Sequence, residues 1–119
     1  TPNVSLRPRR RKQGSYDVQP IVETRRAEVA ELCGRFHVRR LEVFGSATTE
    51  RFNPVTSDLD FLVEFEPMGP ESYADDYFGL LAALEGLFGN PIDLVSVRAI
   101  RNPYFAAGVD ATRQTIYAA

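Results

Sequence analysis

The sequence is poor in the residues that form disulfides and zinc sites. Its 119 residues include one cysteine, Cys33, and one histidine, His37. A single cysteine excludes a disulfide within the chain and fits a reducing compartment, so we expect a cytoplasmic protein. One cysteine and one histidine are also too few for a structural zinc site, which takes four such ligands. The sequence therefore gives no sign of a disulfide-stabilised or zinc-stabilised domain.

Long apolar runs are also missing. No stretch approaches the ~18 apolar residues that a membrane-spanning helix needs, and no apolar segment follows the basic N-terminus as it would in a signal peptide. The hydrophobic content of 44% and charged content of 25% are typical of a soluble globular protein. A chain of this length suits one domain, so we expect one domain with no membrane partner.

Lysine is almost absent, and basic residues gather at the N-terminal end. The only lysine, Lys12, lies with four arginines in residues 1–14, which contain no acid. The other residues hold nine arginines and all sixteen acidic residues. We therefore predict an extended or disordered basic arm over residues 1–16 and a folded domain over 17–119. Such an arm can touch RNA or an acidic partner, or can simply be solvated, but the acidic remainder argues against direct nucleic-acid binding.

The most informative stretch runs over residues 41–65 and predicts a strand, a glycine turn, a short helix, a loop and a second strand. Gly45 and Ser46 end the first strand. Glycine allows a sharp turn and close approach by a ligand. Ser46 offers a hydroxyl and a helix N-cap, and backbone N–H groups at a helix start bind anions well. We predict that this corner holds a triphosphate.

Two carboxylates, Asp58 and Asp60, open the second strand. Side chains two apart share a face of a strand, so these residues lie roughly 6–7 Å apart at their backbones and point the same way. They can lean together onto one or two Mg²⁺ ions, which proteins hold through one or two carboxylates plus the phosphates of a substrate. The alternative is an acidic, solvent-facing strand edge. The Phe-Gly-Ser corner that precedes this pair favours the metal site.

Asp93 is the third candidate. It is the only charge in an apolar run over residues 91–97, which predicts a third strand. A charge is costly to bury there unless something pairs with it. Asp93 is either an exposed edge residue, or a third metal ligand or general base, and the second role requires this strand to lie beside the Asp58–Asp60 strand. Three arginines could also reach phosphates, although no motif fixes them: Arg51, Arg98 and Arg101.

Apolar residues at helical spacing predict two helices around these strands. The first begins near Pro20 and is ended by Gly34. The second has Ser72 as its N-cap, with Asp75 three residues on as in a capping box, and residues 89–91 end it. Both helices present an apolar stripe that a sheet could cover.

A third helix is predicted to begin at Asn102 and Pro103 and to continue through Ile116, closing the core. Together with the strands, the helices predict an α/β fold, in which a small mixed sheet of at least three strands is packed against helices.

The motifs resemble those of the minimal nucleotidyltransferases, the MNT family of the polymerase-beta superfamily. That family carries a hydrophobic residue and Phe-Gly-Ser, as at residues 43–46, and later Ser-Asp-hydrophobic-Asp-hydrophobic, as at residues 57–61. The Pro-Ile-Asp-Leu-Val stretch over 91–95 is similar to the family's third-carboxylate motif. The loop over residues 47–57 is one residue longer than the commonest form, and the resemblance covers roughly residues 20–119.

The resemblance implies the nucleotidyltransferase fold and Mg²⁺-dependent transfer from ATP. It places Asp58, Asp60 and Asp93 as catalytic and metal-binding residues, with Gly45 and Ser46 on the nucleotide. Many members are antitoxins paired with a small helical HEPN ribonuclease, so the implied reaction moves AMP from ATP onto a tyrosine hydroxyl of that toxin. The alternative is a non-catalytic antitoxin that neutralises its toxin by direct binding. The expected partners are a HEPN toxin and a nucleoside triphosphate, and the sequence leaves homo-oligomers or hetero-oligomers open.

Overall fold

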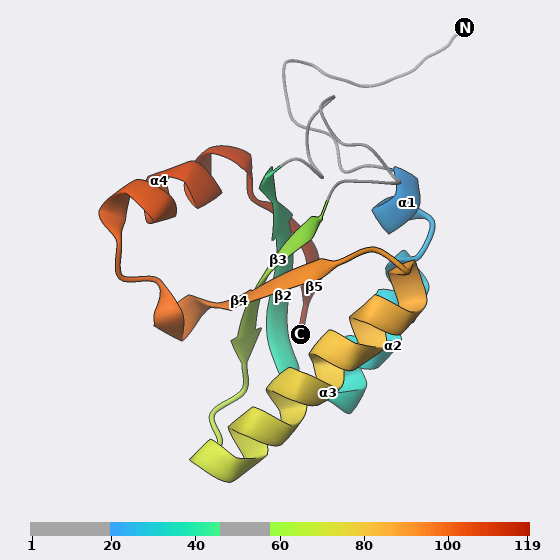
Figure 1. Ribbon diagram of the computed structural model, residues 1–119. Helices are drawn as coiled ribbons and strands as arrows, with labels where there is room; N and C mark the ends of the chain where they lie inside the picture. The colour runs from blue at the N-terminus through green and yellow to red at the C-terminus, as the bar shows by residue number, and fades with distance from the viewer. Residues whose placement is uncertain (1–19, 46–57) are drawn as a thin grey trace, which may run out of the picture.

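A four-stranded mixed sheet forms the centre of the protein (Figure 1). The computed structural model describes residues 20–45 and 58–119. The strands follow the order β4-β3-β2-β5, with β2 antiparallel to β3 and β5, and β3 parallel to β4. The bounds of the elements are α1 (Pro20–Glu23), α2 (Arg26–Arg35), β2 (Val38–Phe44), β3 (Leu59–Phe65), α3 (Pro70–Phe88), β4 (Ile92–Ser96), the 3-10 helix η2 (Val97–Ala99), α4 (Pro103–Thr112) and β5 (Gln114–Ala118).

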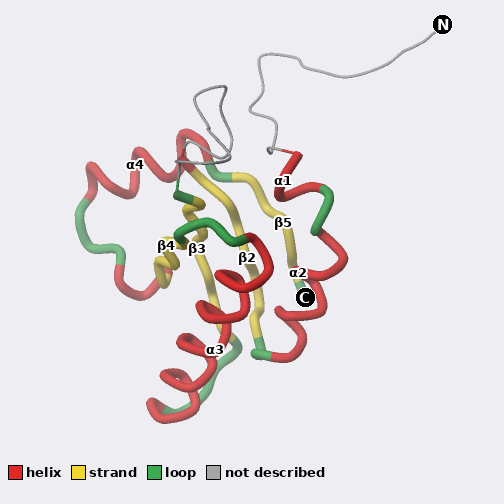
Figure 2. Tube along the Cα trace, turned by 45° about the vertical axis from the view of Figure 1, so that its right-hand side comes forward, coloured by secondary structure: helices red, strands yellow, loops and turns green. Residues whose placement is uncertain are grey.

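Helices cover both faces of the sheet. Figure 1 shows α2 and α3 on one side and α4 on the other, and Figure 2 shows the same layers from a second direction. The alternation of β3 explains this arrangement, because Leu59, Phe61 and Val63 join the main core while Leu62 packs with Phe44 and Val109 on the α4 face. The predicted α/β fold with a small mixed sheet is confirmed.

The first two helices differ in their bounds from the sequence-based expectation. The predicted helix from Pro20 is broken after Glu23, and its second part continues past Gly34 to Arg35. The helix α3 begins at Pro70 with Gly69 as its N-cap, so the prediction that Ser72 caps it is wrong by three residues. Proline at the first helical position is already shaped for a helix start, and here it outweighs the Ser-x-x-Asp signal.

The C-terminal segment also differs from its prediction. The helix α4 ends at Thr112, and Ile116 lies in a fourth strand, β5, instead of in the helix. Ile116 is 6% exposed and reaches the main core from that strand. The strand β5 gives β2 its second neighbour, so β2 and β3 become the two central strands.

The sheet edge formed by β4 is partly blocked by a side chain. The carbonyl of Pro91 accepts a hydrogen bond from the N–H of Leu59, so the backbone groups of Leu94, three residues on, face away from β3. The hydroxyl of Tyr77 donates to the Leu94 carbonyl. A side chain from α3 therefore satisfies an outward-facing group of β4, which makes this edge a poorer template for another strand.

The predicted basic arm over residues 1–16 lies outside the described residues, as do Ser46, Arg51 and the short helix expected after the glycine corner. None of the helices in residues 20–45 and 58–119 combines the length and apolar character that crossing a membrane requires.

A buried ion pair joins the central strand to the end of α4. Glu42 is 4% exposed, and its carboxylate accepts hydrogen bonds from the guanidinium of Arg113 and from the hydroxyl of Thr115. Arg113 also binds the exposed Asp110 through a second nitrogen, 2.6 Å from the carboxylate. The pair fixes the junction of α4 and β5 against β2.

Arg113→Met should lower the free energy of unfolding by about 2–3 kcal/mol, because it leaves the Glu42 carboxylate buried without its cation. This is below the cost of breaking a fully buried pair, since the Arg113 side chain is 35% exposed. Asp110→Asn is the matched control and should cost less than about 1 kcal/mol, because it removes only a surface partner of the same arginine. Urea unfolding measures both, and equal losses in the two variants would contradict the assignment.

Candidate active site

The structure brings Asp60 and Asp93 together on neighbouring strands. The two residues are register partners in the parallel pairing of β3 with β4. Asp60 lies two residues before Leu62 on β3, and Asp93 lies two residues before Val95 on β4. Leu62 and Val95 belong to the small core on the α4 face, so both carboxylates lie on that face of the sheet. Asp58 is exposed and lies immediately before β3. The third strand therefore lies where a three-carboxylate site requires it.

The carboxylates influence one another electrostatically. Burial, and then the negative charges of Asp93 and Asp58, raise the pKa of Asp60 to about 6. Asp60 is half-buried, whereas Asp58 and Asp93 are exposed. Negative charge is therefore concentrated at one point of the sheet, where a cation would relieve the repulsion.

The donor set fits a hard divalent cation that arrives with phosphate. Within residues 20–45 and 58–119, no three side chains of Asp, Glu, His or Cys are gathered into a group able to hold a metal ion alone. Mg²⁺ needs no such cage, because it keeps several waters and is held by one or two carboxylates plus phosphate oxygens. Asp58 and Asp60 would hold it here, and Asp93 is the candidate for a third ligand or a general base.

Gly45 lies directly against the Asp60 carboxylate. It follows Phe44, the register partner of Asp60 in the β2–β3 pairing, and its φ of 71° lies in the left-handed region. A Cβ at this position would come within 2.5 Å of Asp60 Oδ2. Glycine is thus required twice at this corner, for its backbone conformation and for the space that the carboxylate occupies.

The end of α4 holds this corner in place. The N–H of Gly45 donates to Thr112 Oγ1 over 2.9 Å, and the Thr112 hydroxyl lies 3.4 Å from the Gly108 carbonyl. Sequence reasoning missed Thr112, because a lone threonine at a helix end carries no motif. Only the pairing of β5 with β2 brings residues 112–113 to the corner.

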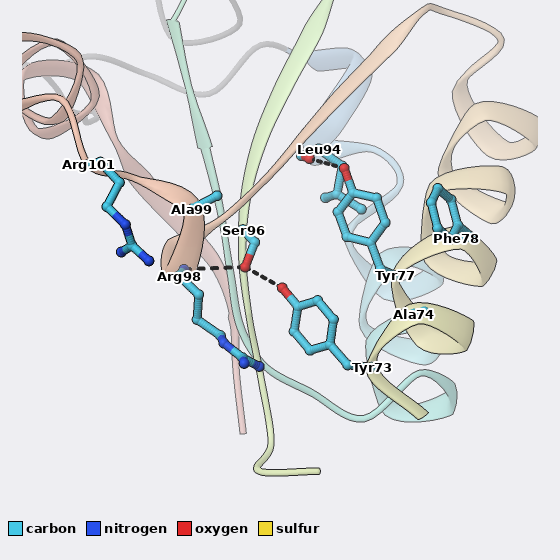
Figure 3. Close-up of a pocket in the computed structure, with 9 residues that line it drawn as sticks. All are labelled: Tyr73, Ala74, Tyr77, Phe78, Leu94, Ser96, Arg98, Ala99 and Arg101. Atoms are coloured by element: carbon cyan, nitrogen blue, oxygen red, sulfur yellow. Dashed lines mark hydrogen bonds between the residues drawn. The ribbon is translucent and has the colours of Figure 1, made fainter. Parts of the chain in front are cut away.

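The two arginines after β4 lie away from the carboxylates. Asp93 is near the start of β4, whereas Arg98 and Arg101 follow its end and line a cavity beside α3 (Figure 3). The structure therefore does not bring them to the phosphates that Asp60 and Asp93 would serve through a metal.

The comparisons with known proteins define the class of the protein. The model of the nucleotidyltransferase domain family matches residues 26–114, which include Gly45, Asp58, Asp60 and Asp93, and the chain belongs to this family. It is a nucleotidyltransferase.

Two proteins similar to this chain carry more specific descriptions than the family as a whole. A "putative protein adenylyltransferase" of Methanocaldococcus jannaschii is 31% identical over 77 residues, which are 64% of this chain and 74% of that protein. A solved "putative minimal nucleotidyltransferase" is 35% identical with a TM-score of 0.63, over 85% of this chain and 98% of the other.

A more distant likeness concerns the fold alone. The complex of a tri-AMPylated HEPN toxin with an MNT antitoxin from Shewanella oneidensis contains a chain that is 16% identical, with a TM-score of 0.52 over 82% of this chain and 72% of that one. A toxin–antitoxin structure with AMP-PNP gives 15% identity and a TM-score of 0.58, over 79% and 73% of the two chains.

Proposed function

We propose that the protein is a Mg²⁺-dependent protein adenylyltransferase that acts as an antitoxin. It transfers AMP from ATP to a tyrosine hydroxyl of a partner HEPN ribonuclease in the cytoplasm. The observation that carries the proposal is the in-register pair Asp60 and Asp93 beside Gly45. The name of the M. jannaschii relative and the solved toxin–antitoxin complexes support a protein as the acceptor and a HEPN toxin as the partner.

Each residue of the candidate site has its own role in the proposed phosphoryl displacement. When bound, Mg²⁺ would neutralise phosphate charge and orient the attacking and leaving oxygens. Asp58 and Asp60 would bind this ion, and Gly45 and Ser46 would hold the triphosphate. The tyrosine oxygen forms a bond to the α-phosphorus while the bond from that phosphorus to the bridging oxygen breaks, so pyrophosphate leaves. Asp93 is exposed and would take the tyrosine proton, or it would serve as a third ligand while that proton passes to solvent water.

The proposal predicts label on the partner. The protein is incubated with Mg²⁺, a HEPN protein of the same organism, and ATP labelled at its α-phosphate. The label and one or more AMP units should then appear on the HEPN protein, as measured by intact mass, and peptide mapping should place them on tyrosine. Asp93→Asn should reduce the transfer at least about a hundredfold, because it removes the charge but keeps the shape.

Asp75→Asn is the control for this experiment, because Asp75 is an exposed acid on α3 and lies outside the site. It should leave the rate unchanged. If the toxin is neutralised without any gain in mass, the protein acts by direct binding and the enzymatic proposal is wrong. Label derived from the γ-phosphate instead of the α-phosphate would show a different phosphoryl transfer.

A further inference from the structure

A cavity of about 570 Å³ lies between α3 and the segment that follows β4 (Figure 3). The helix contributes Tyr73, Tyr77 and Phe78. The end of β4 contributes Ser96, and the segment after it contributes Arg98 and Arg101. Leu94 and Ser96 line the cavity, and they alternate along β4 with Asp93, so the cavity lies on the other face of this strand from the carboxylates. The cavity is therefore separate in position from the carboxylate site.

The polar side of the cavity is positively charged. Among the described residues that line it, none is acidic, although the chain after the basic arm is acidic overall. Among the ion pairs of residues 20–45 and 58–119, none involves Arg98 or Arg101. Two guanidinium groups beside one serine hydroxyl therefore offer donors to an anion.

The cavity wall is held by internal contacts. The Arg98 guanidinium lies 4.6 Å from the centre of the Tyr73 ring, and the Tyr73 hydroxyl donates to Ser96 Oγ. The backbone N–H of Arg98 also donates to Ser96 Oγ, over 3.3 Å. These contacts tie α3 to η2 and fix one of the two cations before any ligand arrives.

The opposite side of the cavity is aromatic. Tyr77 directs its hydroxyl to the Leu94 carbonyl, so its ring is the surface that remains for a ligand. Phe78 contacts that ring edge-to-face, with 5.1 Å between centroids, and is 64% exposed. An aromatic ring system can therefore pack here while its anionic group faces the arginines.

We propose that this cavity is a second binding site, which takes a small molecule that joins a phosphate group to an aromatic ring system. The cavity volume lies within the range of small-molecule sites. Two arginines match the double charge of a terminal phosphate, and their planar donors suit its oxygens. Carboxylates repel phosphate and need a metal ion to bind it, whereas guanidinium groups bind it directly, so the new site works without metal.

The test uses AMP as the probe, in the presence of a chelator that removes divalent metal. Ala74 and Ala99 line the cavity, and their methyl groups report its occupancy by NMR. AMP should shift both signals in a saturable way. Adenosine, which lacks the phosphate, and inorganic phosphate, which lacks the rings, should each bind at least about tenfold more weakly, because each keeps only half of the contacts.

Arg98→Ala and Arg101→Ala should each weaken the binding of AMP by about tenfold or more. Arg39→Ala is the matched control, since it removes an exposed arginine of β2 that does not line the cavity. Arg98→Lys keeps the charge but loses the planar fork, so it should bind AMP with intermediate affinity and also shows that an effect of Arg98→Ala is not a loss of folding.

The proposal is overturned if AMP leaves Ala74 and Ala99 unshifted at millimolar concentration. It is also overturned if the shifts require Mg²⁺, or if Asp60→Asn abolishes them while both arginine variants leave them unchanged, since AMP would then bind at the carboxylates. This readout needs neither a partner protein nor transfer activity, so it can fail or succeed independently of the proposed adenylyltransferase function.

Discussion

Asp60→Asn is expected to reduce nucleotidyl transfer by about a thousandfold, equivalent to about 4 kcal/mol of transition-state stabilisation. Asp60 is the half-buried member of the carboxylate group, lies in register with Asp93 and contacts the Gly45 corner. Its loss removes the negative charge that lies closest to the Gly45 corner among the three carboxylates of the proposed site. The rate of AMP incorporation into the partner protein, measured with enzyme in excess, gives the effect directly.

The fold should survive this substitution. Because burial, and then the charges of Asp93 and Asp58, raise the pKa of Asp60, its ionised form is disfavoured in the folded state. A neutral amide avoids both the cost of burying the charge and the repulsion. The melting temperature of Asp60→Asn at neutral pH should therefore equal or exceed that of the wild type. Glu64→Gln is the matched control, since Glu64 is half-buried and lies on the same face of β3. Wild-type transfer by Asp60→Asn would refute the site, and a loss in Glu64→Gln would show that any acid on this face matters.

Gly45→Ala is expected to reduce transfer by about a hundredfold and to lower the free energy of unfolding by about 1–2 kcal/mol. The decrease in the free energy of unfolding comes from placing a Cβ at a residue with a positive φ. The loss of activity comes from the clash of that Cβ with Asp60 Oδ2, which must move away from its present position. Steady-state transfer and urea unfolding measure the two effects separately.

Gly89→Ala separates these two causes. Gly89 has nearly the same φ, 74°, at the end of α3, but a Cβ there would meet no atom within 4 Å. This variant should lose similar stability and keep its transfer activity. If both variants are equally inactive, the loss reflects backbone strain alone, and the contact between Gly45 and Asp60 has no special role.

Local pattern was sufficient to predict the strands that carry the carboxylates. Side chains in the run that contains Asp60 point alternately to the two faces of a strand, so the residues of each face could be assigned. Asp93 is the only charge in its apolar run, which indicated a candidate functional residue. A three-carboxylate site requires these two strands to be adjacent, and the parallel pairing of β3 with β4 meets this requirement. The catalytic roles of Asp58, Asp60 and Asp93 stay predictions.

The parts that sequence reasoning missed depend on contacts between distant residues. Val109, Thr112 and Ile116 follow helical spacing, and no glycine or proline separates them, so pattern alone continues the helix through β5. Residues 24 and 25 likewise contain no breaker, yet the chain leaves the helix there. The partners of Gly45 and Glu42 come from residues near 112–115, and only tertiary pairing brings them together.

The pairing of β5 with β2 also sets the order of events during synthesis. The strands β2, β3 and β4 leave the ribosome before β5, so a nascent chain can pair these three while one edge of β2 stays open. An open central strand invites pairing with other chains, which makes rapid arrival of β5 valuable for solubility. Thr112 and Arg113 emerge with it. A ribosome-bound chain that lacks this segment therefore lacks the hydrogen bond from the Gly45 N–H to the Thr112 hydroxyl.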